Sequence, residues 1–172
     1  MEENAGEVFM FSYGFSFSVE RLYRAWTEID RLREWWGPKG FELTRCALDF
    51  RRGGVFHYCL RDPDGCDMWG KWVITRVLPR RRLEFIVSFC DESAGDPVPH
   101  PYEPHWPLEV ASEVRFQPTE GGTRLEVLWT PLNAGGTERR VFAARHDDCR
   151  RGWTGTMERL ERYLLNEGKV LR

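Results

Sequence analysis

The residues best suited to chemistry are a histidine and a cysteine, His146 and Cys149, three positions apart near the C-terminal end. On a helix this spacing places both side chains on one face. Two such residues can contribute to a zinc site, but structural zinc needs four ligands. No other residues complete the set at a recognisable spacing. We therefore predict no metal site and no cofactor.

The same two residues could instead act in catalysis. A neutral imidazole titrates near neutrality, so His146 could serve as a general base. Its acidic neighbours, Asp147 and Asp148, do not face the same way around a helix, and Cys149 lacks an activating motif. Packing or pocket lining is the favoured interpretation of both, and we predict no catalytic residue.

Aromatic residues are the more distinctive feature of the composition. They make up 14 % of the 172 residues and include eight tryptophans. This is more ring surface than a minimal core needs, which favours either a thick core or an aromatic-lined cavity. Trp36 and Trp153 lie where helices must meet a sheet, so both could form a wall of such a cavity.

Charge and cysteine content limit the class of protein. The 25 basic residues nearly cancel the 27 acidic ones, which argues against nucleic acid as a partner. Five scattered cysteines without a CxxC pair favour a reducing compartment over a disulfide framework. No segment approaches the roughly 18 consecutive apolar residues of a membrane span, and the acidic N-terminus is unlike a signal peptide. We expect a cytoplasmic protein without membrane insertion.

A long amphipathic helix, predicted over Glu138–Asn166, must position His146, Cys149 and Trp153. Apolar or small residues recur along it at steps of three and four, while the opposite face is densely charged. Thr137 is the predicted N-cap and Gly168 the predicted C-terminal stop. The rest of the chain must close on the apolar face, which comprises Phe142, His146, Cys149, Trp153, Thr156, Leu160 and Tyr163 or Leu164.

Upstream, the pattern predicts one strand, two short helices and six further strands. The first strand spans Glu7–Phe17, the helices begin near Ser18 and Thr27, and Gly37-Pro38 ends the second. In most later strands apolar and polar residues alternate, as is typical of an antiparallel sheet covered on one face. The six strands are predicted at Phe41–Phe50, Val55–Arg61, Met68–Leu78, Leu83–Cys90, Leu108–Gln117 and Thr123–Thr130.

This order of elements predicts an α+β fold in which a strongly curved antiparallel sheet wraps around the C-terminal helix. The whole chain, residues 1–172, is predicted to be one domain. Such a sheet rarely seals against a single helix, so an internal cavity is expected between them. The predicted ligand-binding residues combine inward positions of both walls with the polar anchors Tyr58 and Ser112: Trp36, Phe56, Tyr58, Trp72, Phe85, Val87, Ser112, Val114, His146, Cys149 and Trp153.

A proline-rich insertion, residues 91–107, separates two of the strands. It holds five of the ten prolines, which keep a loop extended and relatively stiff. Long loops in compact domains are often functional. One hypothesis makes this loop a lid, with Tyr102 and Trp106 closing the mouth of the cavity. A surface excursion or a homodimer contact is the alternative.

These segments together resemble the START-like, helix-grip superfamily, and within it the family related to the C-terminal domain of the Hsp90 ATPase activator. The resemblance covers about residues 8–165 and implies the order β-α-α-β6-α, with a hydrophobic pocket between the sheet and the last helix. The matching pieces are Val19–Trp26, Leu32–Pro38, Asp49–Gly54, Asp62–Gly65, and Gly152-Trp153 with Leu160.

Three functions follow from the resemblance. Relatives bind lipids, polyketides or other apolar small molecules, and binding of an apolar or aromatic small molecule is the favoured function. A few relatives catalyse cyclisation or condensation, so a cyclase- or hydrolase-type enzyme that uses polar groups of the pocket is the first alternative. The second is a chaperone or protein-interaction module, which is weakly supported because the activator's separate N-terminal Hsp90-binding domain has no counterpart in this sequence.

Overall fold

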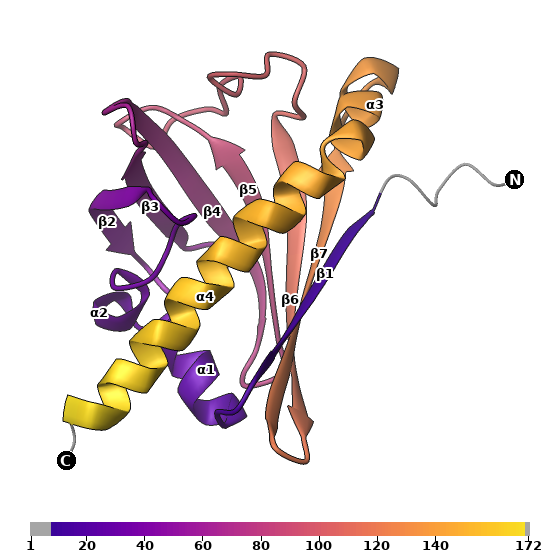
Figure 1. Cartoon of the computed structure of the whole chain (residues 1–172). Coiled ribbons are helices and arrows are strands. Elements are labelled where there is room, and N and C mark those ends of the chain that lie inside the picture. The colour runs from indigo at the N-terminus through magenta and orange to yellow at the C-terminus, as the bar shows by residue number, and fades with distance from the viewer. Residues whose placement is uncertain (1–7, 171–172) are drawn as a thin grey trace, which may run out of the picture.

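The structure, a computed structural model, describes residues 8–170. Its seven strands form one antiparallel sheet in the order β1-β7-β6-β5-β4-β3-β2. A long helix, α4 (His146–Val170), crosses one face of this curved sheet diagonally (Figure 1). Two short helices, α1 (Val19–Thr27) and α2 (Ile29–Leu32), lie at the end of the sheet that the C-terminal half of α4 reaches (Figure 1). The predicted α+β helix-grip fold is confirmed.

The strands occupy the predicted segments, with ends that differ by a few residues. β3 (Val55–Arg61) has the predicted bounds, while β1 (Phe9–Phe15) is shorter than predicted at both ends, and Glu7 lies outside the described residues. The predicted alternation is also present, since Val110, Val114 and Phe116 of one strand are all buried. The remaining strands are β2 (Glu42–Leu48), β4 (Asp67–Leu78), β5 (Arg82–Phe89), β6 (Glu109–Thr119) and β7 (Gly122–Leu132).

A cluster of aromatic rings centred on Trp26 fills one half of the space between the sheet and α4. Trp26 comes from the last turn of α1 and stacks on Trp72 of the sheet and on Trp153 of α4, with ring centroids 5.8 and 6.2 Å apart. Trp35, which follows α2, meets it edge-on at 5.0 Å. Beyond Trp153, α4 adds three fully buried side chains to this packing: Met157, Leu160 and Leu164.

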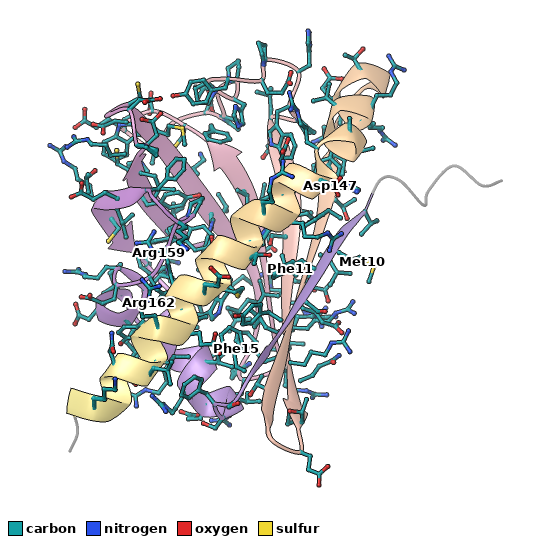
Figure 2. The ribbon with its side chains drawn as sticks, viewed as in Figure 1. Met10, Phe11, Phe15, Asp147, Arg159 and Arg162 are labelled. Atoms are coloured by element: carbon teal, nitrogen blue, oxygen red, sulfur yellow. The ribbon has the colours of Figure 1, made fainter. Side chains whose placement is uncertain are left out.

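An arginine anchors α4 to the chain between α2 and β2. The Nη1 of Arg159 donates hydrogen bonds to the carbonyl oxygens of Gly37, Pro38 and Phe41, at 3.0, 3.1 and 3.1 Å. Figure 2 labels Arg159 on the side of α4 that faces these elements. One guanidinium therefore satisfies several carbonyls of an irregular segment and holds it against the helix.

The C-terminal helix differs from its prediction at both ends and in its middle. It is divided into α3 (Gly136–Ala144) and α4, with a break at Arg145. The Arg145 N–H is shared between the carbonyls of Val141 and Phe142, a local departure from the regular helix ladder. Gly135 occupies the N-cap without a side-chain hydrogen bond, so Thr137 does not cap the helix as predicted. Gly168 lies inside α4 and does not end it.

Candidate ligand-binding cavity

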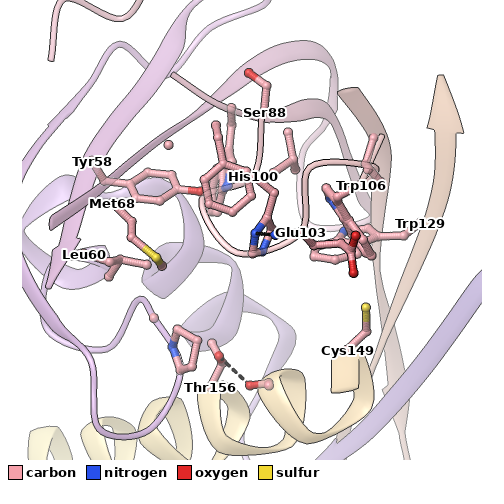
Figure 3. A pocket seen from close by; sticks show the side chains of 18 of the residues that line it. Tyr58, Leu60, Met68, Ser88, His100, Glu103, Trp106, Trp129, Cys149 and Thr156 are labelled. Carbon is pink, nitrogen blue, oxygen red and sulfur yellow. Dashed lines mark hydrogen bonds between the residues drawn. The ribbon is translucent and has the colours of Figure 1, made fainter. Parts of the chain in front are cut away.

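A cavity of about 480 Å³ lies between the sheet, the first half of α4 and the proline-rich loop (Figure 3). This volume falls within the range of roughly 300–1,000 Å³ that is usual for small-molecule sites. The cavity lies at one end of the fold because the Trp26 cluster fills the other end. Its walls are mainly aromatic and aliphatic side chains, and Trp36, Trp72 and Trp153 separate it from the packed core.

Seven of the predicted ligand-binding residues line this cavity, and both predicted lid residues, Tyr102 and Trp106, lie along it as well. Tyr58, Phe85 and Val87 project from neighbouring strands, and Trp36 projects from the segment after α2. Cys149 and Trp153 are one turn apart on α4. The seven residues are Trp36, Tyr58, Trp72, Phe85, Val87, Cys149 and Trp153.

Phe56 and Val114 lie outside the lining. Both point inward as predicted, but they sit in the filled half of the space beneath α4 and are fully buried. The Phe56 ring contacts that of Trp72, with centroids 4.7 Å apart. A side chain that points inward therefore need not contact the cavity, because the Trp26 cluster fills part of the space between the sheet and α4.

Ser112 and His146 also lie outside the lining. The Ser112 hydroxyl accepts a hydrogen bond from the indole Nε1 of Trp129 at 3.0 Å, so it serves packing within the sheet. His146 packs between the rings of Phe9 and Phe142, with centroids 5.5 and 5.1 Å away. His146 is the first residue of α4, and these two rings, rather than the cavity, surround it.

Tyr58 is a buried polar residue of the cavity wall, as predicted. It lies opposite Gly70 in the pairing of β3 with β4, and a Cβ at Gly70 would come within 2.7 Å of the phenol oxygen. Glycine at this position thus leaves the room that the ring needs. Burial raises the pKa of the Tyr58 phenol, and the nearby indole N–H groups of Trp72 and Trp36 only partly oppose this shift.

The proline-rich loop adds a histidine that the sequence did not single out as a site residue. His100 extends from the loop into the cavity toward α4 (Figure 3). Its Nδ1 accepts hydrogen bonds from the backbone N–H groups of Tyr102 and Glu103, at 3.0 and 3.1 Å. Burial lowers its pKa, although Glu103 acts in the opposite direction. The ring is therefore neutral near pH 7.

Several side-chain contacts tie the loop to the rest of the fold. Lys71 donates to the carbonyl of Gly95 at 2.6 Å and Arg45 pairs with Glu92 at 2.7 Å, and two further contacts lie beside the cavity. The Tyr102 hydroxyl donates to the Oδ2 of Asp62 at 2.5 Å, which connects the loop to the turn between β3 and β4. On the opposite side, the Glu103 carboxylate pairs with Arg145 at 2.9 Å. Arg145 is the residue between α3 and α4, so this ion pair joins the loop to the break in the helix.

The family of this protein is shown by its sequence. Residues 16–165 match the family described as Activator of Hsp90 ATPase homolog 1-like protein. The chain belongs to this family. The match confirms the resemblance drawn from the tryptophan, glycine and turn residues of the sequence. None of the curated proteins compared with the chain matches it.

Several solved structures share the fold of this chain. Protein NE0264 from Nitrosomonas europaea is 25 % identical with a TM-score of 0.73, over 96 % of this chain and 98 % of that one. A protein from Arthrobacter aurescens is 24 % identical with a TM-score of 0.76, over 96 % and 90 %. The AHSA1 protein from Silicibacter pomeroyi is 21 % identical with a TM-score of 0.70, over 93 % and 99 %. At such identities the likeness is one of fold.

Among the described residues, the one thiol that lines the cavity is protonated near neutral pH. Burial raises the pKa of the Cys149 thiol to about 12, so the thiol keeps its proton near neutral pH. Within residues 8–170, no three His, Cys, Asp or Glu side chains gather in a way that could hold a metal ion. No helix in the same range is long and apolar enough to cross a membrane. What distinguishes the site is its apolar volume.

Proposed function

We propose that this protein binds an apolar or aromatic small molecule in the cavity beneath the proline-rich loop. The observation that supports this most strongly is the composition of the walls. Indole, phenyl and aliphatic groups surround a space of about 480 Å³, and polar groups are few. Transfer of apolar surface from water to such a site stabilises a complex by about 25 cal/mol per Å². A lipid- or polyketide-like molecule has the matching chemistry.

The proline-rich loop is the proposed gate of this site. Its two attachments beside the cavity, Tyr102 to Asp62 and Glu103 to Arg145, are polar contacts near the surface that can open without exposing the core. The contacts of Lys71 with Gly95 and of Arg45 with Glu92 hold the start of the loop in place. The prolines limit how many conformations the released loop can adopt, which lowers the entropy lost when it closes again. A ligand would enter as these two contacts break and would be enclosed as they form again.

Catalysis and protein docking have less support. A cyclase or hydrolase needs converging ionisable groups, but the Cys149 thiol is protonated and His146 lies outside the cavity. A docking module needs a continuous exposed apolar patch. In the part of the chain that the structure describes, the large apolar side chains with more than half of their surface exposed are spread over three elements. Met10 is on β1, Leu165 is on α4, and Tyr102 and Leu108 are on the connection between β5 and β6.

A glycine of α4 provides a direct test of binding. Gly152 lines the cavity, and a Cβ built on it would have no atom within 4 Å. Gly152→Leu should therefore occupy part of the cavity, since its first side-chain atom has free space, and should stabilise the helix by up to about 1 kcal/mol. Native mass spectrometry of the purified protein and calorimetric titration with naphthalene derivatives would measure occupancy.

The matched control is Gly168→Leu, the same substitution in the same helix at a position away from the cavity that also has free space around it. We expect Gly152→Leu to lose the co-purifying ligand and the titration signal, while Gly168→Leu keeps both. Equal binding by the two variants and the parent protein would contradict a ligand site in this cavity.

A further inference from the structure

We propose that the cavity selects apolar ligands that carry a neutral hydrogen-bond acceptor, such as the oxygen of a ketone, ester or amide, and that Tyr58 and His100 donate to it. This inference rests on the proposed ligand-binding function and adds the chemical class of the ligand. Two donors facing one apolar space are complementary to a carbonyl oxygen, which has two lone pairs.

The first donor is the hydroxyl of Tyr58. Within residues 8–170 it makes no hydrogen bond, and Figure 3 shows the side chain pointing into the cavity. The indole N–H groups of Trp36 and Trp72 are directed at the phenol oxygen without reaching full hydrogen-bond geometry. An indole N–H can only donate, so neither group engages the hydrogen of the phenol. The O–H bond is left as the group that can meet a ligand.

The position of this hydroxyl is well defined, because the Tyr58 ring is enclosed on several sides. It contacts the rings of Phe56 and Trp36, with centroids 5.0 and 5.7 Å apart, and Gly70 lies against its end. Burial also keeps the phenol protonated, since it raises the pKa. The side chain is therefore a fixed, uncharged donor, which makes the site preorganised for an acceptor.

The second donor is the Nε2 of His100. Because Nδ1 accepts two backbone hydrogen bonds, the neutral ring must carry its proton on Nε2. Nε2 makes no hydrogen bond in the part of the chain that the structure describes. The ring reaches into the cavity from the proline-rich loop, while Tyr58 reaches in from the sheet (Figure 3). A ligand acceptor between them would join the loop to the sheet.

The charged side chains of the lining are already paired with one another, which argues against charged ligands. Glu103 and Asp148 both pair with Arg145, at 2.9 and 3.2 Å, so the carboxylates and the guanidinium neutralise one another. The Thr156 hydroxyl donates to the carbonyl of Gly152 at 2.8 Å. An anionic ligand would find no unpaired cation in this lining, and a cationic ligand would find no unpaired carboxylate. A neutral acceptor fits the groups that remain.

The test compares two ligands of nearly the same shape by titration calorimetry. In 2-acetylnaphthalene a carbonyl oxygen replaces the terminal CH2 of 2-isopropenylnaphthalene. We expect the parent protein to bind the ketone about tenfold more tightly, the effect of roughly one hydrogen bond with its desolvation cost. Tyr58→Phe should remove most of this preference and leave the affinity for the hydrocarbon unchanged, which also shows that the variant is folded. His100→Phe should reduce the preference further.

A second measurement detects the hydrogen bond itself. The carbonyl stretching frequency of the bound ketone should lie below its value in hexane, and Tyr58→Phe should move it back toward that value. Equal affinities of the two compounds for the parent protein, or an unshifted carbonyl band, would overturn the acceptor preference and leave the cavity as an unselective apolar site. If neither compound binds, both this inference and the proposed function are contradicted. Tighter binding of 2-naphthoate than of the ketone would replace the neutral acceptor with an anionic one.

Discussion

The reactivity of a cysteine in this protein depends on whether its side chain is buried beside the cavity or exposed to solvent. Cys149 is half-buried on the cavity side of α4, whereas Cys66 is exposed. Since the pKa of the Cys149 thiol is raised to about 12, almost none of it is thiolate at pH 8. We expect iodoacetamide to label Cys66 quickly and Cys149 slowly, as followed by peptide mass spectrometry. An apolar ligand should slow Cys149 further, and faster labelling of Cys149 than of Cys66 would contradict this account.

Trp153 belongs to both the core and the cavity wall. One side of its ring packs on Trp26 and Trp36, at 6.2 and 5.9 Å between centroids, and the residue also lines the cavity. Trp153→Ala should lower the free energy of unfolding by about 3 kcal/mol, the lower end of the usual range, because part of the ring borders open space. Urea denaturation would measure the loss.

The control for Trp153 is Leu165→Ala, a truncation in the same helix at a side chain that is 54 % exposed. It should change stability by no more than about 0.5 kcal/mol. An equal loss in both variants would mean that the Trp26 cluster does not support the fold as described. A ligand titration of Trp153→Ala should also show altered affinity for apolar probes.

Single residues of the site were predictable only in part. Alternation along β3 and β5 correctly identified the inward side chains, which include Tyr58 and Phe85. It could not separate Tyr58 from Phe56, because both point inward and only the Trp26 cluster decides which of them meets open space. His100 has no periodic pattern to reveal it, since its orientation depends on two backbone hydrogen bonds within an irregular loop.

Among the elements, the proline-rich loop is the one whose attachment can be tested in isolation. Tyr102→Phe removes the hydrogen bond to Asp62 and changes little else, because the Tyr102 side chain is 62 % exposed. We expect faster amide hydrogen exchange in residues 98–106 and faster ligand release, with nearly unchanged urea midpoints. Hydrogen exchange followed by mass spectrometry and stopped-flow dilution would provide these measurements.

Tyr13→Phe is the matched control for the loop, since it removes a tyrosine–carboxylate hydrogen bond to Glu161, 2.9 Å long, that lies outside the loop. Loop exchange and ligand release should keep their original rates in this variant. The competing hypothesis, a homodimer contact, predicts instead that shortening the loop yields monomers in light scattering while ligand kinetics stay the same. That result would rule out the gate.

Elements with a regular period were predictable from the sequence, and the interruptions between them were not. β3 has its predicted bounds, and Phe56, Tyr58 and Leu60 are buried at every second position as the pattern indicates, although Cys59 between them is buried as well. The break at Arg145 occurs without proline or glycine, so the sequence carries no local sign of it. The break accompanies contacts between distant residues, such as the packing of Trp106 on Phe142 and the pairing of Glu103 with Arg145.

The stability of the whole molecule should decrease with falling pH in two stages. Burial lowers the pKa of His100 and of His146 below the ordinary value of about 6.5. As pH falls below about 6.5, the unfolded chain takes up these protons before the folded protein does, so the free energy of unfolding decreases. Glu103 and Asp147 oppose the shifts, and Arg145 and Arg150 support them.

The second stage comes from carboxylates in ion pairs. Hydrogen bonds from Arg24 and Arg61 lower the pKa of Glu28 and of Asp67. Their contribution is complete above the unfolded pKa values of about 4 and is lost as pH falls through the folded values. Urea midpoints measured between pH 8 and 3 should show both stages. The double variant His100→Gln, His146→Gln should flatten only the upper one, and a flat profile in the parent protein between pH 7 and 5 would contradict the first stage.

The overall architecture was the most predictable level, because many weak patterns all point to the same packing. The helix-grip fold is the economical way for one amphipathic helix to cover one apolar sheet face, so small errors at the element ends do not change it. The position of the cavity was less accessible to prediction. It depends on how much of the space beneath α4 the packed rings of Trp26, Trp72 and Trp153 fill. Sequence patterns indicate which side chains point inward but not the volume that they leave open.

The arrangement of tryptophans has an optical consequence. Trp36 and Trp72 meet nearly at right angles with ring centroids 4.6 Å apart, and Trp153 lies 5.9 Å from Trp36 and 5.6 Å from Trp129. Indoles this close couple their excited states, and all four border the cavity. Any molecule that enters will change their emission colour, quantum yield and exciton bands. Occupancy of this protein can therefore be followed by its own fluorescence, without a label.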